Sequence, residues 1–408
     1  MEEIHITIIG AGAVGCAIAY ELSRYFSDEK SREIVVVEKN EQINGENQSS
    51  RNSGVIHAGI YYPKDFGPLK SKFCVEGNNL LYNFCSKYDV PCRKTGKLVV
   101  AVNKLEEEYL EDVYRIAVEN QVSGVRYLSK EEIKKFEPNV EGISALYVPA
   151  SGIVEPTCLV SRFYKIAEEN GAIFLEGSRV VEVEPECDFS YIGIKTRTGT
   201  ERFRTRFLIN SAGLYSDEVA KMINPESPYE MEPVKGEWAK FYSTRRPDIM
   251  INGLNVYPVP AGYTPDGVKL SISLKEFNKL FKENKITRSV GVHLSPTFSL
   301  DRGRHVIGDT IIVGPAYSRP KDKEDYAHSK NEKTLLDAVI SFFPNLRIED
   351  ISLHQTGIRA KLKNHYDFVI ESDRKYTHCV NLVGIDSPGL TSCLSIARYV
   401  KEIIKEQS

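Results

Sequence analysis

The sequence predicts an α/β protein, α+β overall, built from a discontinuous Rossmann-like domain with a mainly antiparallel β domain inserted into it. Three observations predict this fold. A β-branched run enters a complete G-x-G-x-x-G at residues 10–15. Strand-like segments at 206–213 and 380–384 end on small residues, each with a helix after it. A proline-rich, strand-like stretch lies between them at 232–317. Such alternation is typical of a nucleotide-binding sheet carrying a second, β-rich lobe.

The first forty residues contain the clearest local pattern. Residues 4–9 are expected to form a buried parallel strand, and residues 16–25 have the apolar spacing of a helix. A second strand is expected at 34–37, directly before an acidic residue. This order of strand, glycine turn, helix, strand and acid is the context in which the glycine motif indicates a dinucleotide.

Each part of this motif has a physical task. Gly10 allows the tight turn, Gly12 lets the backbone approach a pyrophosphate, and Gly15 lets the helix pack close to the strand. Glu38 is placed to accept hydrogen bonds from an adenosine ribose, which favours FAD or NAD over NADP. We therefore predict one bound dinucleotide. The alternative is a glycine turn without a ligand.

Further elements follow a polar loop at 39–51. Residues 261–288 form a lysine-rich insertion with no clear period, for which we expect a hairpin extension or a mobile flap. Helices are expected at 69–88, 104–119, 157–170, 333–343 and 392–405, with another beginning at Ser129, and strands at 96–102, 173–175, 178–183, 192–196, 206–213, 234–241, 256–260, 291–296 and 380–384. We assign residues 1–78, 150–222 and 352–408 to the nucleotide-binding domain, and 79–149 and 223–351 to the substrate domain.

Composition excludes several classes of protein. A formal charge of −3 with 27% charged and 41% hydrophobic residues is typical of a globular protein and predicts no nucleic-acid surface. No apolar run is long enough to span a bilayer, and the glycine motif begins too near Met1 for a signal peptide. We expect a cytoplasmic protein and leave peripheral membrane contact open. The eight cysteines form no C-x-x-C pair and the histidines lack metal spacing, so no metal site is predicted.

Several stretches together resemble one family. They are residues 52–62, the N-S-A-G at 210–213, the G-I-R at 357–359 and the G-I-D-S-P-G-L-T-S at 384–392. Their order is similar to that in L-2-hydroxyglutarate dehydrogenases, which belong to the D-amino-acid-oxidase-like and glycerol-3-phosphate-dehydrogenase-like flavoproteins. The 261–288 insertion and the residues at 314–317 depart from that pattern. Both departures lie in the expected substrate lobe.

The resemblance implies FAD as the cofactor and assigns its contacts. The 50–54 loop would run along the cofactor, Val180 would offer backbone groups to the adenine, and the turn at 387–391 would stabilise negative charge on the reduced ring. The alternatives are a solvated loop for Ser50 and Arg51 and a proline-initiated helix cap for the turn. The full set of expected cofactor residues is Gly10, Gly12, Gly15, Glu38, Lys39, Ser50, Arg51, Ser53, Gly54, Val180, Ala212, Gly213, Gly357, Pro388, Gly389, Leu390 and Thr391.

The resemblance also implies catalytic and substrate residues. His57 is the candidate base because the ordinary pKa of histidine lies near neutrality; a core histidine or a covalent flavin attachment are the alternatives. Arg359 is the candidate for holding a carboxylate, with a structural ion pair as the alternative. Tyr61, Lys235 and Tyr257 are expected to line the substrate pocket, and His293 to lie there or in the β core.

The resemblance, with these residues, implies an FAD-dependent 2-hydroxy-acid dehydrogenase. The expected reaction converts L-2-hydroxyglutarate to 2-oxoglutarate by hydride transfer to flavin N5, with electrons passing to an acceptor such as a quinone. An amine oxidase of the glycine or sarcosine type and a glycerol-3-phosphate oxidase or dehydrogenase are the enzymatic alternatives. A catalytically inactive FAD-binding protein is the alternative from another class.

Overall fold

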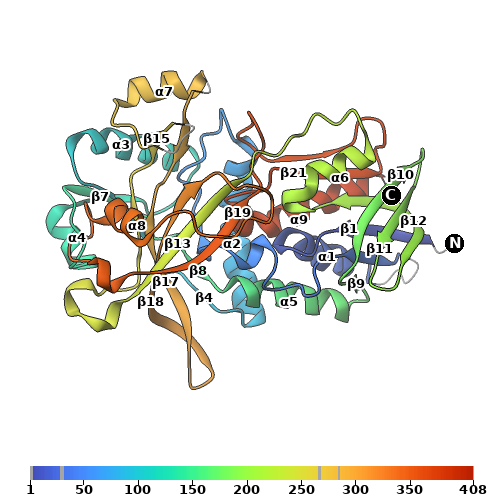
Figure 1. Cartoon of the computed structure of the whole chain (residues 1–408), viewed down its shortest axis with the longest axis horizontal. Helices are drawn as coiled ribbons and strands as arrows, with labels where there is room; N and C mark the ends of the chain where they lie inside the picture. Colours follow the sequence, from blue (N-terminus) through green and yellow to red (C-terminus); the bar gives the residue numbers. More distant parts are fainter. Residues whose placement is uncertain (1–2, 28–31, 265–267, 284, 408) are drawn as a thin grey trace.

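Two large β-sheets at opposite ends of the molecule organise the chain. The computed structural model describes residues 3–27, 32–264, 268–283 and 285–407. Figure 1 shows an elongated molecule with both termini at the end that holds the first sheet. The second sheet occupies the other end, covered by its own helices. The predicted α/β fold with an inserted, mainly antiparallel sheet is confirmed.

The first sheet contains the glycine motif. Its order is β10-β11-β12-β1-β2-β9, with β21 also beside β12 and β20 beside β21. The pairs of β1 with β2 and β12, of β2 with β9 and of β12 with β21 are parallel, as a Rossmann-like sheet requires. The strands are β1 Glu3–Ile9, β2 Ile34–Val37, β9 Ile173–Leu175, β10 Arg179–Pro185, β11 Ser190–Lys195, β12 Thr200–Asn210, β20 Val369–Ser372 and β21 Cys379–Val383.

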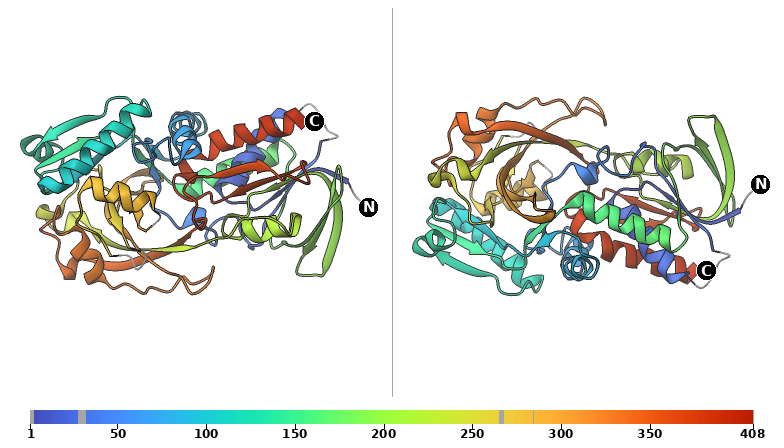
Figure 2. Two further views of the ribbon diagram at one scale, coloured as in Figure 1. Left: turned by 90° about the horizontal axis from the view of Figure 1, so that it is seen from above. Right: turned by 90° about the horizontal axis from the view of Figure 1, so that it is seen from below.

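Four helices cover one face of this sheet. They are α1 Ala13–Tyr25, α2 Pro68–Tyr88, α5 Pro156–Glu169 and α9 Gly389–Gln407. Helix α1 packs between α5 and α9, and α2 packs on α9 (Figure 2). Their buried aliphatic and aromatic side chains share one hydrophobic core with β1, β2 and β12. Helix α6 Ser216–Ile223 lies beside β10 and β21.

The second sheet has the order β19-β13-β18-β17-β14-β5-β7-β6. Only the β5–β14 pair is parallel among its described neighbours. Helices α3 Lys104–Glu119, α4 Lys130–Phe136 and α8 Glu332–Val339 pack against it. The strands are β5 Lys97–Ala101, β6 Arg126–Ser129, β7 Ser144–Tyr147, β13 Val234–Tyr242, β14 Asn255–Pro258, β17 His293–Asp301, β18 Arg304–Ser318 and β19 Ser352–Arg359.

Two small sheets complete the fold. One contains β3 Val55–Ile56, β8 Gly152–Val154 and β4 Cys92–Arg93 and lies at the junction of the two large sheets. The other pairs β15 Ala261–Tyr263 with β16 Thr287–Ser289 at the two ends of the lysine-rich insertion. We call residues 261–289 the extension. Its antiparallel pair agrees with the expected hairpin, with residues 265–267 and 284 outside the described part.

The extension also contains a helix that the sequence analysis missed, α7 Leu274–Lys282. Ser273 caps this helix by accepting a hydrogen bond from the Glu276 N–H at 3.3 Å. Within the helix, the Phe277 side chain is buried. A serine followed three residues later by glutamate is a known helix-start signal, here obscured by the surrounding lysines. The same signal at Ser129 was recognised, and there the capping box is present.

The observed boundaries of other elements differ from the expected ones by a few residues. The strand expected at 206–213 begins at Thr200 and ends at Asn210, and the last helix begins at Gly389. Helix α2 runs unbroken across the domain boundary expected at 78/79, and β19 belongs to the second sheet. The domain assignment stays a proposal. Among the described residues, no helix is long and apolar enough to cross a membrane, and no three His, Cys, Asp or Glu side chains gather like metal ligands.

Candidate active site

The glycine turn is shaped by contacts that leave no space for side chains. Gly10 has a φ of 98°, in the left-handed region that favours glycine. A Cβ on Gly15 would stand 1.9 Å from the Gly10 carbonyl oxygen, so α1 can approach the turn only because residue 15 is glycine. A Cβ on Gly12 would stand 3.1 Å from Ser49 Oγ. The N-terminus of α1 therefore faces the 48–54 loop.

The Glu38 carboxylate is buried beside this turn. One oxygen accepts a hydrogen bond from the Ala11 N–H at 2.7 Å, and the other accepts one from the Asn40 N–H at 2.9 Å. Val180 on β10 is buried in the same hydrophobic cluster as β2. Lys39 lies on the surface, where its ammonium donates to Asn40 Oδ1. Glu38 and Val180 are thus buried near the end of β2, whereas the Lys39 side chain is exposed.

The serines of the 48–54 loop have different partners. Ser49 accepts a hydrogen bond from the Ala13 N–H, in the first turn of α1, at 2.8 Å. The expected cofactor residue Ser50 instead accepts one from the Gly45 N–H at 2.9 Å. Ser53 accepts one from the indole N–H of Trp238 at 2.9 Å, which ties the loop to the second sheet. Sequence reasoning missed Ser49, which is the serine of this loop that bonds to the start of α1.

Arg51 joins this loop to the second lobe. Its guanidinium lies over the Tyr326 ring, 4.3 Å from the centroid, and its Nε is buried without a hydrogen-bond partner among the described residues. A Cβ on Gly357 would stand 2.2 Å from the Arg51 carbonyl oxygen. A Cβ on Gly54, whose φ is 63°, would stand 2.5 Å from the Val154 carbonyl oxygen. Both glycines permit backbone segments to meet here.

Open space lies at Gly213, in the turn after β12. The Ser211 N–H donates to the Ile9 carbonyl at 3.0 Å and holds the turn after β12 next to β1. In that turn, following Ala212, Gly213 has a φ of 57° and nothing within 4 Å of the position of a Cβ. Ligands of parallel α/β sheets bind outside the carboxyl ends of the strands, where this space lies. The open space at Gly213, the glycines of the turn and the unpartnered Arg51 Nε fit the predicted dinucleotide.

His57 lies at the junction of the two lobes, against the start of α9. Its backbone N–H donates to Thr391 Oγ1 at 3.0 Å, and its Nε2 is 3.4 Å from Ser387 Oγ. Its Nδ1 is buried without a partner in the described part of the chain. The expected cofactor residues Pro388, Gly389, Leu390 and Thr391 lie at this same helix start.

The imidazole of His57 is neutral at neutral pH. Burial lowers its pKa well below the usual 6.5, and the charges of Lys97, His293 and Arg359 lower it further. A neutral imidazole has one nitrogen free to accept a proton. The surroundings therefore favour the unprotonated imidazole, which is the form that can accept a proton.

Arg359 is held next to His57 by consecutive residues. Its Nη2 is 3.1 Å from Asp386 Oδ2, and Asp386 directly precedes the serine that contacts His57. Its Nη1 donates to the Tyr317 hydroxyl at 3.1 Å. The other Asp386 oxygen is 2.7 Å from the Lys70 ammonium, so the carboxylate is shared between two cations. The Arg359 side chain is 34% exposed, which leaves part of the guanidinium open to a ligand.

Tyr257 lies at the centre of a second cluster. Its ring stacks on the His293 imidazole with centroids 3.8 Å apart and planes at 13°. The Lys97 ammonium lies 3.8 Å from the same centroid. Two groups at these distances cannot share one face, so Tyr257 separates the ammonium from the imidazole. Tyr61 stacks on Tyr257 at 6.3 Å.

Buried polar atoms without partners concentrate around these rings. Among the described residues, the unpartnered atoms here are His57 Nδ1, Tyr61 Oη, Lys97 Nζ, His293 Nε2, and Nε and Nη2 of Arg288. Buried polar groups in folded proteins nearly always have partners. The concentration of such atoms, most of them donors, indicates a site for an acidic ligand.

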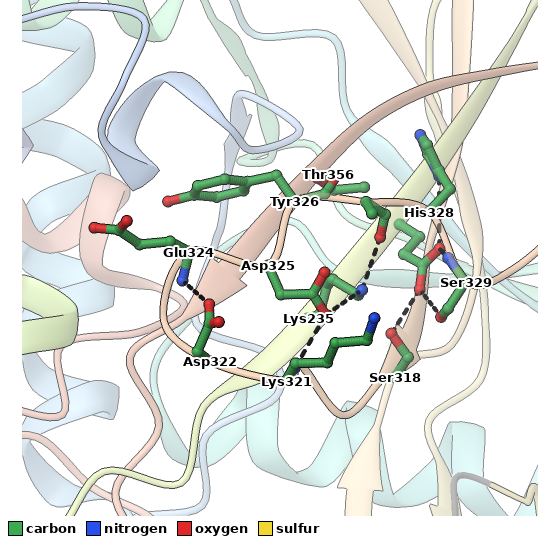
Figure 3. Close-up of polar contacts among 12 residues, drawn as sticks. Lys235, Ser318, Lys321, Asp322, Glu324, Asp325, Tyr326, His328, Ser329 and Thr356 are labelled. Carbon is green, nitrogen blue, oxygen red and sulfur yellow. Dashed lines mark hydrogen bonds and ion pairs between the residues drawn. The ribbon is translucent and has the colours of Figure 1, made fainter.

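Lys235 lies apart from this cluster. In the pairing of β13 with β19, Val234 is opposite Arg359 and Lys235 is opposite Ile358, so Lys235 and Arg359 point to opposite faces. The Lys235 ammonium donates to Asp325 Oδ2 at 2.9 Å and to the Ala327 carbonyl at 2.7 Å, in the loop at 319–331 (Figure 3). Its side chain anchors that loop.

Several residues around the site were missed from the sequence. They are Ser49, Lys70, Lys97, Arg288, Tyr317, Tyr366 and Asp386. Lys97 did leave a signal, because a lysine between Gly96 and the apolar run 98–102 places a charge at the start of a buried strand. Ser49 and Asp386 are neighbours in sequence of predicted site residues, and the remaining residues meet the site only through long-range packing.

The chain is similar to known proteins over nearly its whole length. The family model described as FAD dependent oxidoreductase matches residues 5–403. L-2-hydroxyglutarate dehydrogenase of Indibacter alkaliphilus is 30% identical, covering 98% of both chains. The mitochondrial L-2-hydroxyglutarate dehydrogenase of Mus musculus is 34% identical, covering 97% of this chain and 87% of that protein.

A solved structure is similar as well. The L-α-glycerophosphate oxidase of Mycoplasma pneumoniae, with FAD bound, superposes with a TM-score of 0.81 at 25% identity, covering 99% of this chain and 95% of that one. The expected FAD cofactor and oxidoreductase activity agree with these similarities. The protein described above belongs to the FAD-dependent oxidoreductase family.

Proposed function

We propose that this protein oxidises L-2-hydroxyglutarate to 2-oxoglutarate. The observation that carries the proposal is the meeting of neutral His57 and cationic Arg359, through the neighbouring residues Ser387 and Asp386. A 2-hydroxy acid needs a base for its hydroxyl proton and a cation for its carboxylate. The names of the relatives at 30% and 34% identity support the same substrate.

The chain's own residues have separate tasks in this proposal. Arg359 binds the C1 carboxylate and orients C2 and its hydroxyl. His57 accepts the hydroxyl proton on Nε2, the nitrogen that faces Ser387. Bound FAD supplies the two-electron acceptor for the C2 hydrogen. The rings of Tyr61 and Tyr257 exclude water from the pocket, since both side chains are buried.

The cofactor residues are proposed in the same way. Gly10, Gly12 and Gly15 hold the pyrophosphate at the N-terminus of α1, and Glu38 lies at the ribose. The start of α9 offers backbone N–H groups to the flavin ring. A quinone is the proposed electron acceptor and the cytoplasm the proposed location.

An absorption spectrum tests the proposal directly. The purified protein is expected to be yellow, and L-2-hydroxyglutarate added without oxygen is expected to bleach the flavin bands. D-2-hydroxyglutarate is the matched control, because it offers the same charges with the opposite configuration at C2. If the protein is yellow and is bleached by glycerol 3-phosphate or glycine instead, that compound would replace L-2-hydroxyglutarate as the assigned substrate. One bleached by none of these compounds would favour the catalytically inactive alternative.

Two variants separate the roles of the site residues. Changing His57→Gln is expected to lower the rate of flavin reduction by about 10²–10⁴-fold with a smaller change in substrate affinity. Changing Arg359→Lys is expected to weaken substrate binding instead, because lysine cannot form the bidentate contact. Equal effects of both variants on affinity alone would contradict the assignment of His57 as the base.

A further inference from the structure

Arg288 is a buried guanidinium supplied by the extension. It lies on β16, opposite Gly262 of β15, and its side chain is only 7% exposed. Its Nη1 is 2.9 Å from Asp112 Oδ2 on α3. Its Nε and Nη2 are buried and have no hydrogen-bond partner in the described part of the chain.

This pairing leaves the guanidinium only partly satisfied. A guanidinium has five N–H groups, and a buried cation is normally paired and fully hydrogen-bonded. Asp112 is also shared, since its other oxygen accepts a hydrogen bond from Arg115 at 2.7 Å. The arrangement suits a ligand that brings its own negative charge to Nε and Nη2.

The charge of Arg288 acts on the pocket. Burial raises the pKa of the Tyr366 hydroxyl to about 12, and the charges of Arg288 and Arg359 both oppose that rise. Tyr366 donates to the Tyr61 carbonyl at 3.3 Å, and the buried Tyr61 hydroxyl also lies within the field of Arg288. Arg288 and Arg359 therefore both act on Tyr366, from different parts of the chain, and Arg288 acts on Tyr61 as well.

A dicarboxylate has a second carboxylate that also needs a binding partner. In the function proposed above, Arg359 binds the first carboxylate. The second needs another cation in the same pocket, with N–H groups not yet used. Arg288, whose charge acts on Tyr61 and Tyr366, has two buried nitrogen atoms, Nε and Nη2, without a hydrogen-bond partner among the described residues.

We propose that Arg288 binds the second carboxylate of a dicarboxylic 2-hydroxy acid, with the Tyr61 hydroxyl as a further donor. The extension is then the wall that selects dicarboxylates over monocarboxylates. This inference rests on the proposed function and names a specificity residue within it. It also gives the extension a task other than that of a mobile flap.

The test compares two substrates of equal chain length. L-2-Hydroxyvalerate has a methyl group where L-2-hydroxyglutarate has its second carboxylate. In Arg288→Met we expect the KM for L-2-hydroxyglutarate to rise roughly 30-fold with little change in kcat, since one charged hydrogen-bonding contact is lost. The kcat/KM for L-2-hydroxyvalerate should stay within about 3-fold.

Arg115→Met is the matched control. It removes the other partner of Asp112, but the Arg115 side chain is 56% exposed and outside the pocket. We expect its preference between the two substrates to equal that of the wild type. An unchanged preference in Arg288→Met would overturn the inference, and so would an equal loss of preference in Arg115→Met.

Ligand binding provides a readout independent of turnover. Glutarate has both carboxylates but no hydroxyl, so it should raise the melting temperature of the wild type and of Arg115→Met, and not that of Arg288→Met. If L-2-hydroxyglutarate fails to reduce the wild type but glutarate still depends on Arg288, the proposed reaction fails and the dicarboxylate site stands. If the reaction occurs and glutarate binds Arg288→Met as well as the wild type, only this inference fails. Should Arg288→Met not fold, Arg288→Lys replaces it, with an expected rise in KM of about 10-fold.

Discussion

Two buried charges of the second sheet, Glu237 and Lys97, differ in the number of hydrogen-bond partners that the protein supplies to them. Glu237 on β13 and Lys97 on β5 are both completely buried. Glu237 accepts hydrogen bonds from Ser318 Oγ at 2.6 Å and from the N–H groups of Ser329 and Lys330 at 2.7 and 2.9 Å. Figure 3 shows Ser318 and Ser329 converging on this point. Lys97 has no hydrogen-bond partner among the described residues, only the faces of two tyrosine rings.

This difference in hydrogen-bond partners distinguishes a structural charge from a charge that is available to a ligand. The protein supplies every partner that Glu237 needs, so the carboxylate stabilises the fold by itself. Lys97 Nζ, the Tyr61 hydroxyl, His293 Nε2, and Nε and Nη2 of Arg288 have no partner among the described residues, which lowers stability and keeps these atoms available. Removing a satisfied charge should therefore destabilise the protein, and removing an unsatisfied one should stabilise it.

The largest expected effect is the loss of Glu237. Glu237→Ala removes the acceptor of two hydroxyls and two backbone N–H groups, so we expect the free energy of unfolding to fall by about 3–5 kcal/mol. Urea denaturation measures this. Glu232→Ala is the control, because Glu232 is 53% exposed and pairs with Lys361 at 3.3 Å; its loss should cost less than about 1 kcal/mol. Similar values for the two variants would break the comparison.

Lys235 should also behave as a structural residue. Its ammonium is buried against Asp325 and the Ala327 carbonyl, and the sequence alone assigned it to the pocket. We expect Lys235→Met to lower the free energy of unfolding by about 2–3 kcal/mol and to leave the KM for L-2-hydroxyglutarate unchanged within a factor of about 2. A stable variant with a raised KM would restore the pocket role.

Lys97→Met is expected to act with the opposite sign. Burial lowers the pKa of Lys97 from the usual 10.5 to about 7, while the nearby Cys74 raises it slightly. The other groups that face the Lys97 ammonium are His57, Tyr61, Tyr257 and His293, and none of these is a carboxylate. We expect Lys97→Met to raise the free energy of unfolding by about 1–2 kcal/mol at pH 7.

The sign of the pH dependence follows from linkage. Between pH 7 and 10.5 the unfolded chain holds a proton on Lys97 that the folded protein has lost, so wild-type stability rises with pH in this window. The advantage of Lys97→Met should be full below pH 7 and should shrink towards pH 10.5. A constant difference measured by urea denaturation across these pH values would contradict the depressed pKa.

The smallest effect is expected for a single hydroxyl. The Tyr61 hydroxyl is buried without a partner among the described residues, so Tyr61→Phe should change the free energy of unfolding by no more than about 0.5 kcal/mol. The Tyr109 hydroxyl donates to the Ile272 carbonyl at 2.9 Å, and Tyr109→Phe should cost about 1 kcal/mol. A larger loss for Tyr61→Phe would show that its hydroxyl has a structural partner.

Register explains why the sequence misplaced Lys235. Arg359 and Lys235 lie on neighbouring strands, and a shift of one residue in their pairing would exchange the faces to which they point. Composition and spacing favour both as ligands for an acid. The observed pairing places Arg359 in the site and Lys235 against the 319–331 loop.

The sequence by itself determined the glycine turn and the elements around it, because the closest contact of Gly15 and the hydrogen bonds of Glu38 lie within the first forty residues. Helices with clear spacing or a capping box were predictable for the same local reason. Only the tertiary structure decided the pocket. Lys97, Arg288 and Arg359 come from strands far apart in the chain, and their charges meet only after both lobes have packed. Burial with unmet hydrogen bonds marks Lys97 and Arg288, and the contacts with Asp386 and Tyr317 mark Arg359; all of these exist only in the folded protein.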